Sequence, residues 1–139
     1  TETCTGTSTG GTYYIRLKAF SAFSGVSLVG NYTAAGSGPT PIDSTTSNIS
    51  VATNAWKRYT LNLGSGYSTL SFTMSGGTGD ADLYVTNGSQ STTSAYDCRP
   101  YNSGNSEVCT FNAPASGTWY IDIRGYSAAS GVSLRTQAN

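Results

Sequence analysis

Asp80 and Asp82 are the closest pair of carboxylates in the sequence and the first candidates for chemistry. Two carboxylates can hydrolyse a glycosidic bond only when they flank the sugar. Because these two stand at positions i and i+2, at the expected start of a strand, both side chains should point to the same side. Beside the turn "GGTGD", that arrangement suits a hard cation such as Ca²⁺, which takes roughly six to eight oxygen ligands. The alternative is structural, with Asp80 capping the turn and Asp82 pairing with an arginine or accepting backbone N–H bonds.

Other hydrolytic chemistry is excluded by the residue inventory. The sequence contains no histidine, which is the usual general base of serine and cysteine hydrolases and the commonest metal ligand. Seven basic residues balance seven acidic ones, so the formal net charge is zero. A neutral chain is a poor partner for nucleic acid or an anionic membrane, because both require a concentrated basic patch. No apolar run approaches the roughly 18 residues of a transmembrane helix.

Tyrosine is the residue type best suited to a binding surface here, with ten copies in 139 residues. Exposed tyrosine provides rigid contact area with a polar tip, which suits flat fibrous or polysaccharide surfaces. The candidates at outward strand positions or beside a polar loop are Tyr84, Tyr120, Tyr126, Tyr96 and Tyr101. The alternative is that several of them cover the edges of the fold or form a tyrosine corner.

The three cysteines indicate the cellular compartment. Cys98 and Cys109 bracket the polar loop "RPYNSGNSEV", and a disulfide there would close a loop of about 12 residues and contribute roughly 3 kcal/mol to stability. Such a disulfide predicts a secreted, extracellular protein. The alternative is two reduced cysteines in a cytosolic protein. Cys4 has no partner in this scheme, and we expect it to be free or to pair between chains or with an upstream fragment.

The basic residues are too scattered along the sequence for a phosphate site. Arg99 is the exception that could have a local role, because it lies in "DCRPY" and could brace the loop against Asp97 or Glu107. A surface pair of that kind is typically worth under about 1 kcal/mol.

Strands must position these residues, because an alternation with a period of two dominates the sequence. Apolar residues alternate over two runs between positions 59 and 74. In "DLYVT" the alternation places Leu83 inward and Tyr84 outward, and in "TWYIDIRGY" it places Trp119 inward and Asp122 outward. Glycine-rich turn signals separate the runs, and no window has a convincing helical period. The pattern predicts an all-β fold, an antiparallel β-sandwich with one disulfide.

An internal repeat sets the domain organisation. The segment 11–28, "GTYYIRLKAFSAFSGVSL", is nearly repeated at 117–134 as "GTWYIDIRGYSAASGVSL". The second copy follows a long strand-rich stretch from about Ile49, whereas only ten residues precede the first copy. The first copy is therefore expected to be incomplete. The predicted organisation is the C-terminal part of a preceding repeat over 1–33, a Gly-, Pro-, Ser- and Thr-rich linker over 34–48, and a complete domain over 49–139.

Three blocks of the sequence resemble the bacterial pre-peptidase C-terminal domain. They are "GDADLYV" at 79–85, "YDCRPYNSGNSEVCTF" at 96–111 and "GTWYIDIRGYSAASGVSL" at 117–134. The resemblance implies a jelly-roll-like β-sandwich, often in tandem, at the C-terminus of secreted metallopeptidases and serine peptidases. Such domains lie outside the catalytic unit. The related collagen-binding domains of clostridial collagenases bind calcium, which favours a structural Ca²⁺ at Asp80 and Asp82.

The predicted function is a non-catalytic accessory domain of a secreted bacterial peptidase. In one mechanism it binds insoluble protein such as collagen and raises the local substrate concentration for a tethered peptidase domain. In the other it is a removable extension that acts in secretion and maturation. The alternatives are a carbohydrate-binding module, for which exposed tryptophan would be expected, and a structural tandem spacer. Residues 1–33 would lack the first strands of their sandwich. Their order would require the missing portion, a second chain through dimerisation or strand exchange, or docking onto the complete domain.

Overall fold

The computed structural model describes residues 1–6, 12–31 and 38–139. The chain divides into two compact units, Thr1–Ala34 and Ala35–Asn139, which we call the N-terminal unit and the sandwich unit. Parts of the predicted repeat and linker, residues 7–11 and 32–37, lie outside the described residues. Within the described ranges, no helix is long and apolar enough to cross a membrane.

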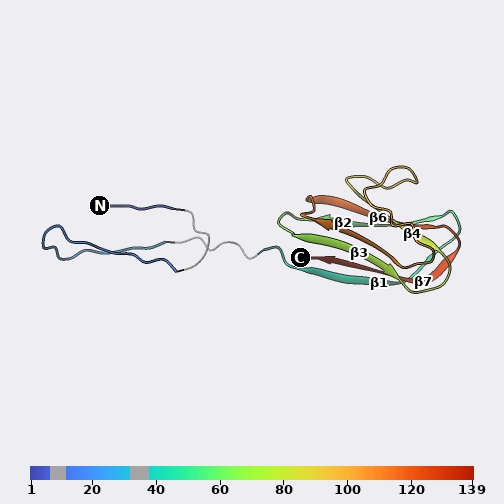
Figure 1. Ribbon diagram of the computed structural model, residues 1–139, viewed down its shortest axis with the longest axis horizontal. Coiled ribbons are helices and arrows are strands. Elements are labelled where there is room, and N and C mark those ends of the chain that lie inside the picture. Colours follow the sequence, from blue (N-terminus) through green and yellow to red (C-terminus); the bar gives the residue numbers. More distant parts are fainter. Residues whose placement is uncertain (7–11, 32–37) are drawn as a thin grey trace. The chain divides into compact units, whose positions relative to one another are not determined.

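The sandwich unit is built from strands, and the described residues contain no helix (Figure 1). The strands are β1 (Ile42–Val51), β2 (Trp56–Leu63), β3 (Thr69–Ser75), β4 (Ala81–Asn87), β5 (Glu107–Asn112), β6 (Gly117–Gly125) and β7 (Ala129–Ala138).

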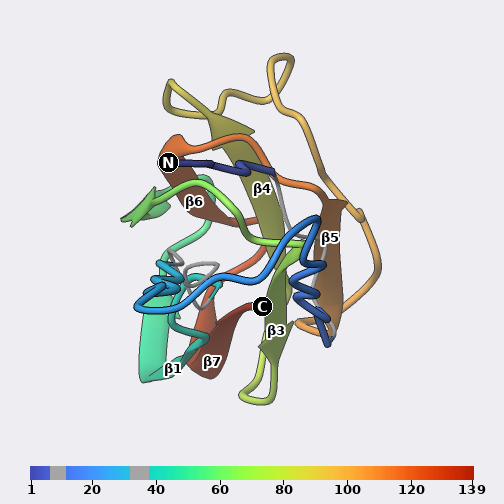
Figure 2. The same cartoon turned by 90° about the vertical axis from the view of Figure 1, so that its left-hand side faces the viewer.

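Two antiparallel sheets pack face to face. One has the strand order β1-β7-β3-β5 and the other β2-β6-β4, and Figure 2 shows β6 and β4 lying above β1, β7 and β3. Consecutive strands alternate between the sheets, as in a jelly roll, so each connection crosses the sandwich. At the free edge of β4 the chain forms a single antiparallel bridge between Val85 and Cys98. The predicted antiparallel β-sandwich is confirmed.

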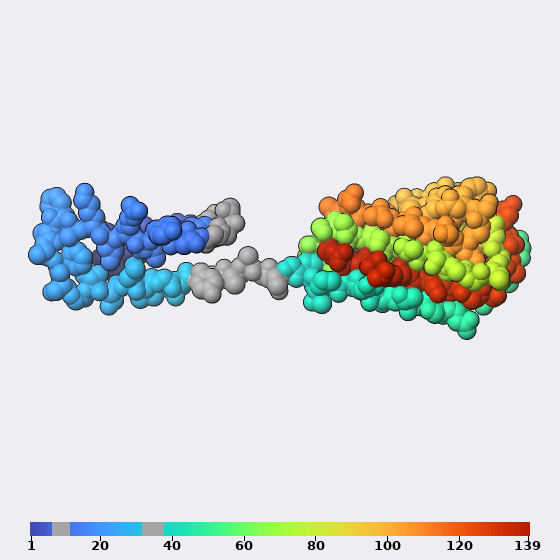
Figure 3. All heavy atoms as spheres, turned by 60° about the horizontal axis from the view of Figure 1, so that its bottom comes forward, coloured from blue at the N-terminus to red at the C-terminus, as the bar shows by residue number. Residues whose placement is uncertain are grey.

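The core lies between the sheets and follows the alternation seen in the sequence. Leu70, Phe72 and Met74 on β3 are fully buried, and Trp119 and the next alternate residues on β6 are buried against them. Burying one side chain of this size contributes roughly 1.5–3 kcal/mol. β6 lies between β2 and β4. β7 lies between β1 and β3, and Figure 3 shows β7 in red between β1 in teal and β3 in green. β6, β7 and the turn between them, which we call the β6–β7 hairpin although the two strands belong to opposite sheets, therefore provide one interior strand of each sheet.

The alternation is misleading on the outer face of the second sheet. Tyr84 and Asp122, both predicted to point to solvent, are completely buried, because residues of the loop 88–106 contact them: Tyr96 packs edge-on against the ring of Tyr84. The backbone N–H of Ser91 donates to Oδ2 of Asp122 over 2.6 Å, and Arg58 pairs with the same oxygen over 3.1 Å. The alternation predicts that this face is exposed to solvent, whereas the loop covers part of it and forms a second, smaller buried region.

The first strand begins earlier than the sequence predicted. Residues 42–48, predicted as linker, belong to β1, and 42–46 pair with the end of β7, with Ile42 opposite Ala138. β1 is an edge strand, and only Ile49 and Val51 within it are buried. An edge strand that is mostly exposed does not need the apolar alternation of a central strand, so its Thr- and Ser-rich sequence resembled a linker.

Candidate functional site

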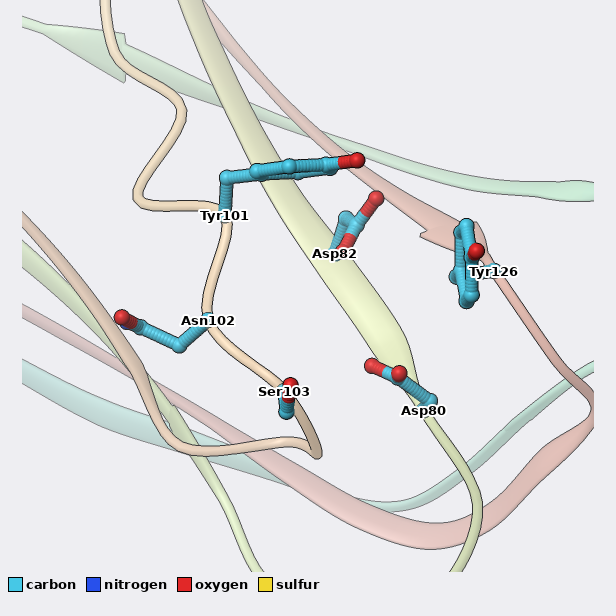
Figure 4. Close-up of a pocket in the computed structure, with 6 residues that line it drawn as sticks. All are labelled: Asp80, Asp82, Tyr101, Asn102, Ser103 and Tyr126. Atoms are coloured by element: carbon cyan, nitrogen blue, oxygen red, sulfur yellow. The ribbon is translucent and has the colours of Figure 1, made fainter.

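A depression of ≈160 Å³ lies on the surface where β4 begins, close to the disulfide loop. Two tyrosines are largely exposed around it, with 61% of Tyr101 and 58% of Tyr126 accessible to solvent. Figure 4 shows the two rings on opposite sides of two aspartates from the start of β4. The lining residues are Asp80, Asp82, Tyr101, Asn102, Ser103 and Tyr126.

The disulfide and one buried carboxylate hold the loop that carries Tyr101. Cys98 and Cys109 form the predicted disulfide, with Cα atoms 6.0 Å apart. Glu107 is buried at the start of β5. It accepts hydrogen bonds from the backbone N–H of Leu83 on β4 and from that of Asn102 in the loop, the latter over 2.8 Å. A buried carboxylate that satisfies two backbone donors ties the loop to both sheets.

Tyr101 adopts a backbone conformation that is unusual for a residue with a side chain. Its φ is +61°, in the left-handed region, where a residue other than glycine costs roughly 1–3 kcal/mol. The guanidinium of Arg99 lies 3.9 Å from the centre of the Tyr101 ring, close enough for a cation–π contact. That contact and the anchored loop fix the direction of the exposed ring.

Arg99 is the centre of an aromatic and acidic cluster. It pairs with Asp82 over 3.4 Å, rather than with Asp97 or Glu107 as the sequence suggested. The same guanidinium lies 4.9 Å from the ring centre of Tyr84 and 6.0 Å from that of Tyr96. One arginine thus connects the start of β4 to the tyrosines of the loop.

Three carboxylates lie in or near the depression, Asp80, Asp82 and Glu107, and they differ in their surroundings. Asp80 accepts a hydrogen bond from the backbone N–H of Gly104 over 3.0 Å. Burial raises the pKa of Asp82, and Arg99 partly opposes that shift. Burial also raises the pKa of Glu107, although hydrogen bonds from the backbone of Leu83 and Asn102 oppose it. The two carboxylates that line the depression, Asp80 and Asp82, therefore already have partners.

Of the five predicted tyrosines, the structure brings two together at the depression, Tyr101 and Tyr126. Tyr96 is exposed nearby and packs edge-on against Tyr84, with ring centres 5.6 Å apart. Tyr84 itself is fully buried, so its proposed role in surface binding is wrong. Tyr120 is half-buried on β6, paired with strand neighbours, and does not line the depression.

Asn102 and Ser103 line the site but were not singled out from the sequence. Their position follows from the loop between Cys98 and Cys109, which turns at Gly104 with a φ of +82°. The available signal was the sequence "YNSGN" inside the disulfide, since Asn, Ser and Gly together mark a tight turn.

The predicted calcium ligands do share one side of β4, as their spacing required. Their contacts, however, match the structural alternative, because Asp82 is already paired with Arg99 and Asp80 with Gly104. Across residues 1–6, 12–31 and 38–139 no group of three His, Cys, Asp or Glu side chains is arranged to hold a metal. Cys4 is exposed and free.

The sandwich unit is thus a disulfide-bonded antiparallel β-sandwich with a polar surface depression between two exposed tyrosines. The family model for the bacterial pre-peptidase C-terminal domain matches residues 57–125. A solved structure titled "Solution structure of vEP C-ter 100" is 41% identical, with a TM-score of 0.55, and the match covers 70% of this chain and 91% of that one. The chain belongs to the bacterial pre-peptidase C-terminal domain family.

Two curated relatives come from peptidases of different catalytic classes. A zinc metalloprotease of Helicobacter pylori is 60% identical over 62 residues, which are 45% of this chain and 24% of that protein. Alkaline serine exoprotease A of Vibrio alginolyticus is 51% identical over 70 residues, which are 50% of this chain and 13% of that protein. The chain thus matches less than a quarter of either relative. It is a secreted, non-catalytic domain of a type shared by peptidases with different active sites.

Proposed function

We propose that the sandwich unit binds insoluble protein such as collagen and thereby holds a tethered peptidase domain on its substrate. The observation that carries this proposal is the pair of exposed tyrosines, Tyr101 and Tyr126, around a polar depression. Tyrosine and arginine are the residue types that most often dominate protein interfaces.

The site is suited to a rigid, extended ligand because its own parts are already ordered. Arg99 and the disulfide loop fix the ring of Tyr101, so binding orders few side chains and little affinity is lost to entropy. Asn102 and Ser103 add amide and hydroxyl groups beside the rings, which can hydrogen-bond a peptide backbone. Even weak binding of this kind raises the effective concentration of substrate for a linked catalytic domain.

Co-sedimentation of the intact chain with insoluble collagen, chitin and cellulose tests the proposal, with albumin as a non-binding protein. We expect retention on collagen, reduced at least about tenfold in a Tyr101→Ala/Tyr126→Ala variant that keeps the natural thermal transition. Tyr14→Ala is the matched control, because it removes an exposed tyrosine of the N-terminal unit.

Other outcomes of this assay would support a different ligand, a different function or a different contact site. Retention on chitin or cellulose alone would replace the protein ligand with a carbohydrate. Retention on no solid would contradict the proposal and favour a removable extension that acts in secretion and maturation. Full retention by the double variant would reject the two tyrosines as the contact site.

A further inference from the structure

Residues 12–31 carry the apolar pattern of the β6–β7 hairpin, and none of the described residues of the N-terminal unit forms a strand that would cover it. The buried positions of β6 and β7 recur there as Tyr13, Ile15 and Leu17, and then Val26 and Leu28, all at the same offset in the repeat. In the N-terminal unit each of these side chains is exposed. No strand is assigned within residues 12–31.

The backbone supports the correspondence between the two segments. Gly25 has a φ of +68°, and its counterpart Gly131, within β7, has a φ of +71°. Both lie in the left-handed region, which residues with side chains rarely adopt. The two segments thus share a conformational feature at the same position of the repeat, in addition to their sequence.

The five remaining strands of this chain are a poor partner for the N-terminal hairpin. Arg58 on β2 lies directly opposite Asp122 on β6 and pairs with it. The counterpart of Asp122 is Arg16. If Arg16 took the position of Asp122, two positive charges, Arg16 and Arg58, would lie opposite each other. The N–H of Ser91 would also lose its acceptor.

Two further positions conflict sterically. A Cβ on Gly125 would overlap the carbonyl oxygen of Ala52, and the counterpart of Gly125 is Ala19. Ala129 is buried in the core, and its counterpart is the much larger Phe23. Overpacking a close-packed core is destabilising. A second copy of this chain would present the same three conflicts.

We infer that residues 12–31 are the closing hairpin of a different sandwich, and that they bind a set of five strands equivalent to β1–β5 with an acidic residue opposite Arg16. The binding partner of residues 12–31 is therefore another polypeptide segment with this fold. It is neither the sandwich unit of this chain nor that of a second copy. Its β2-equivalent carries Asp or Glu where this chain has Arg58, and its core leaves room for Phe23.

Transplanting the hairpin within the intact chain tests the inference. In the first variant, residues 117–134 carry the sequence of 11–28; we expect its thermal midpoint to fall by at least about 10 °C, or the cooperative transition to disappear. In the second variant the transplant keeps Gly125 and Ala129 and Arg58→Glu is added; we expect a cooperative transition to return. Sedimentation velocity of the natural chain should show a monomer over a range of concentrations.

Each contrary result overturns a defined part of the inference. A first variant as stable as the natural chain would show that the five strands of this chain accept the hairpin. A second variant without a cooperative transition would show that 11–28 does not form a closing hairpin. A dimer of the natural chain that Leu17→Asp abolishes would make a second copy the occupant.

Discussion

Residues 12–31 and the β6–β7 hairpin have nearly the same sequence but very different surroundings. Ile121 and Ile123 on β6 are 2% and 0% exposed, whereas their counterparts Ile15 and Leu17 are 66% and 62% exposed. β6 and β7 are each flanked by two other strands. The comparison shows that this sequence becomes a sheet only when four neighbouring strands accept its hydrogen bonds and cover its apolar face.

The largest difference should follow truncation of one apolar side chain in each segment. Ile123→Ala removes a fully buried core residue and should lower the free energy of unfolding by about 3–4 kcal/mol. Leu17→Ala, its matched control, should change it by less than about 0.5 kcal/mol. Urea unfolding of both variants measures the contrast, and equal losses would mean that the N-terminal unit is also part of a packed core.

The disulfide should give the next largest effect, confined to the sandwich unit. Replacing Cys98 and Cys109 by serine removes the link between β5 and the loop and should cost about 3 kcal/mol. Replacing Cys4 by serine should have no effect on unfolding, because that thiol is exposed and free. Thermal unfolding with and without reductant compares the two, and insensitivity of the natural chain to reductant would contradict the expected contribution.

A smaller contrast is expected at the charged position of the repeat. Asp122→Asn should destabilise the sandwich unit by about 1–2 kcal/mol, because it weakens a pair with the partly exposed Arg58 and a hydrogen bond from the N–H of Ser91. The counterpart substitution Arg16→Gln should be neutral, since Arg16 is exposed. Chemical unfolding at neutral pH checks both, and a loss in the second variant would indicate an ordered partner for Arg16.

The smallest effect is a pH dependence of the sandwich unit. Burial raises the pKa of Glu107 above its ordinary value of 4.5 and that of Asp82 above 3.8. When the pH lies between the ordinary pKa and the raised pKa, each carboxyl group keeps its proton in the folded protein but loses it in the unfolded chain. Their contribution to stability is therefore complete at lower pH and is lost as the pH rises through the folded pKa. Unfolding from pH 4 to pH 7 should show a shallower decline in a Glu107→Gln/Asp82→Asn variant, and an unchanged profile would reject these two groups as its source.

The sequence predicted the sandwich, its inward residues and its disulfide because alternation and cysteine spacing report local geometry directly. It failed at Tyr84 and Asp122, since the loop 88–106 that buries them has no periodic pattern and its path across the sheet cannot be read from local sequence. It also missed the start of β1, where an exposed edge strand needs no apolar alternation. At the site, the shared side of Asp80 and Asp82 followed from their spacing. The meeting of Tyr101 with Tyr126 depended on the path of the loop and could not be predicted.

Hydrogen–deuterium exchange of the intact chain tests the central comparison most directly. We expect strong protection of the backbone amides in β6 and β7, where both edges of each strand are hydrogen-bonded, and little protection in residues 12–31. Comparable protection of the two segments would contradict this contrast, because residues 12–31 would then have neighbouring strands in the intact chain.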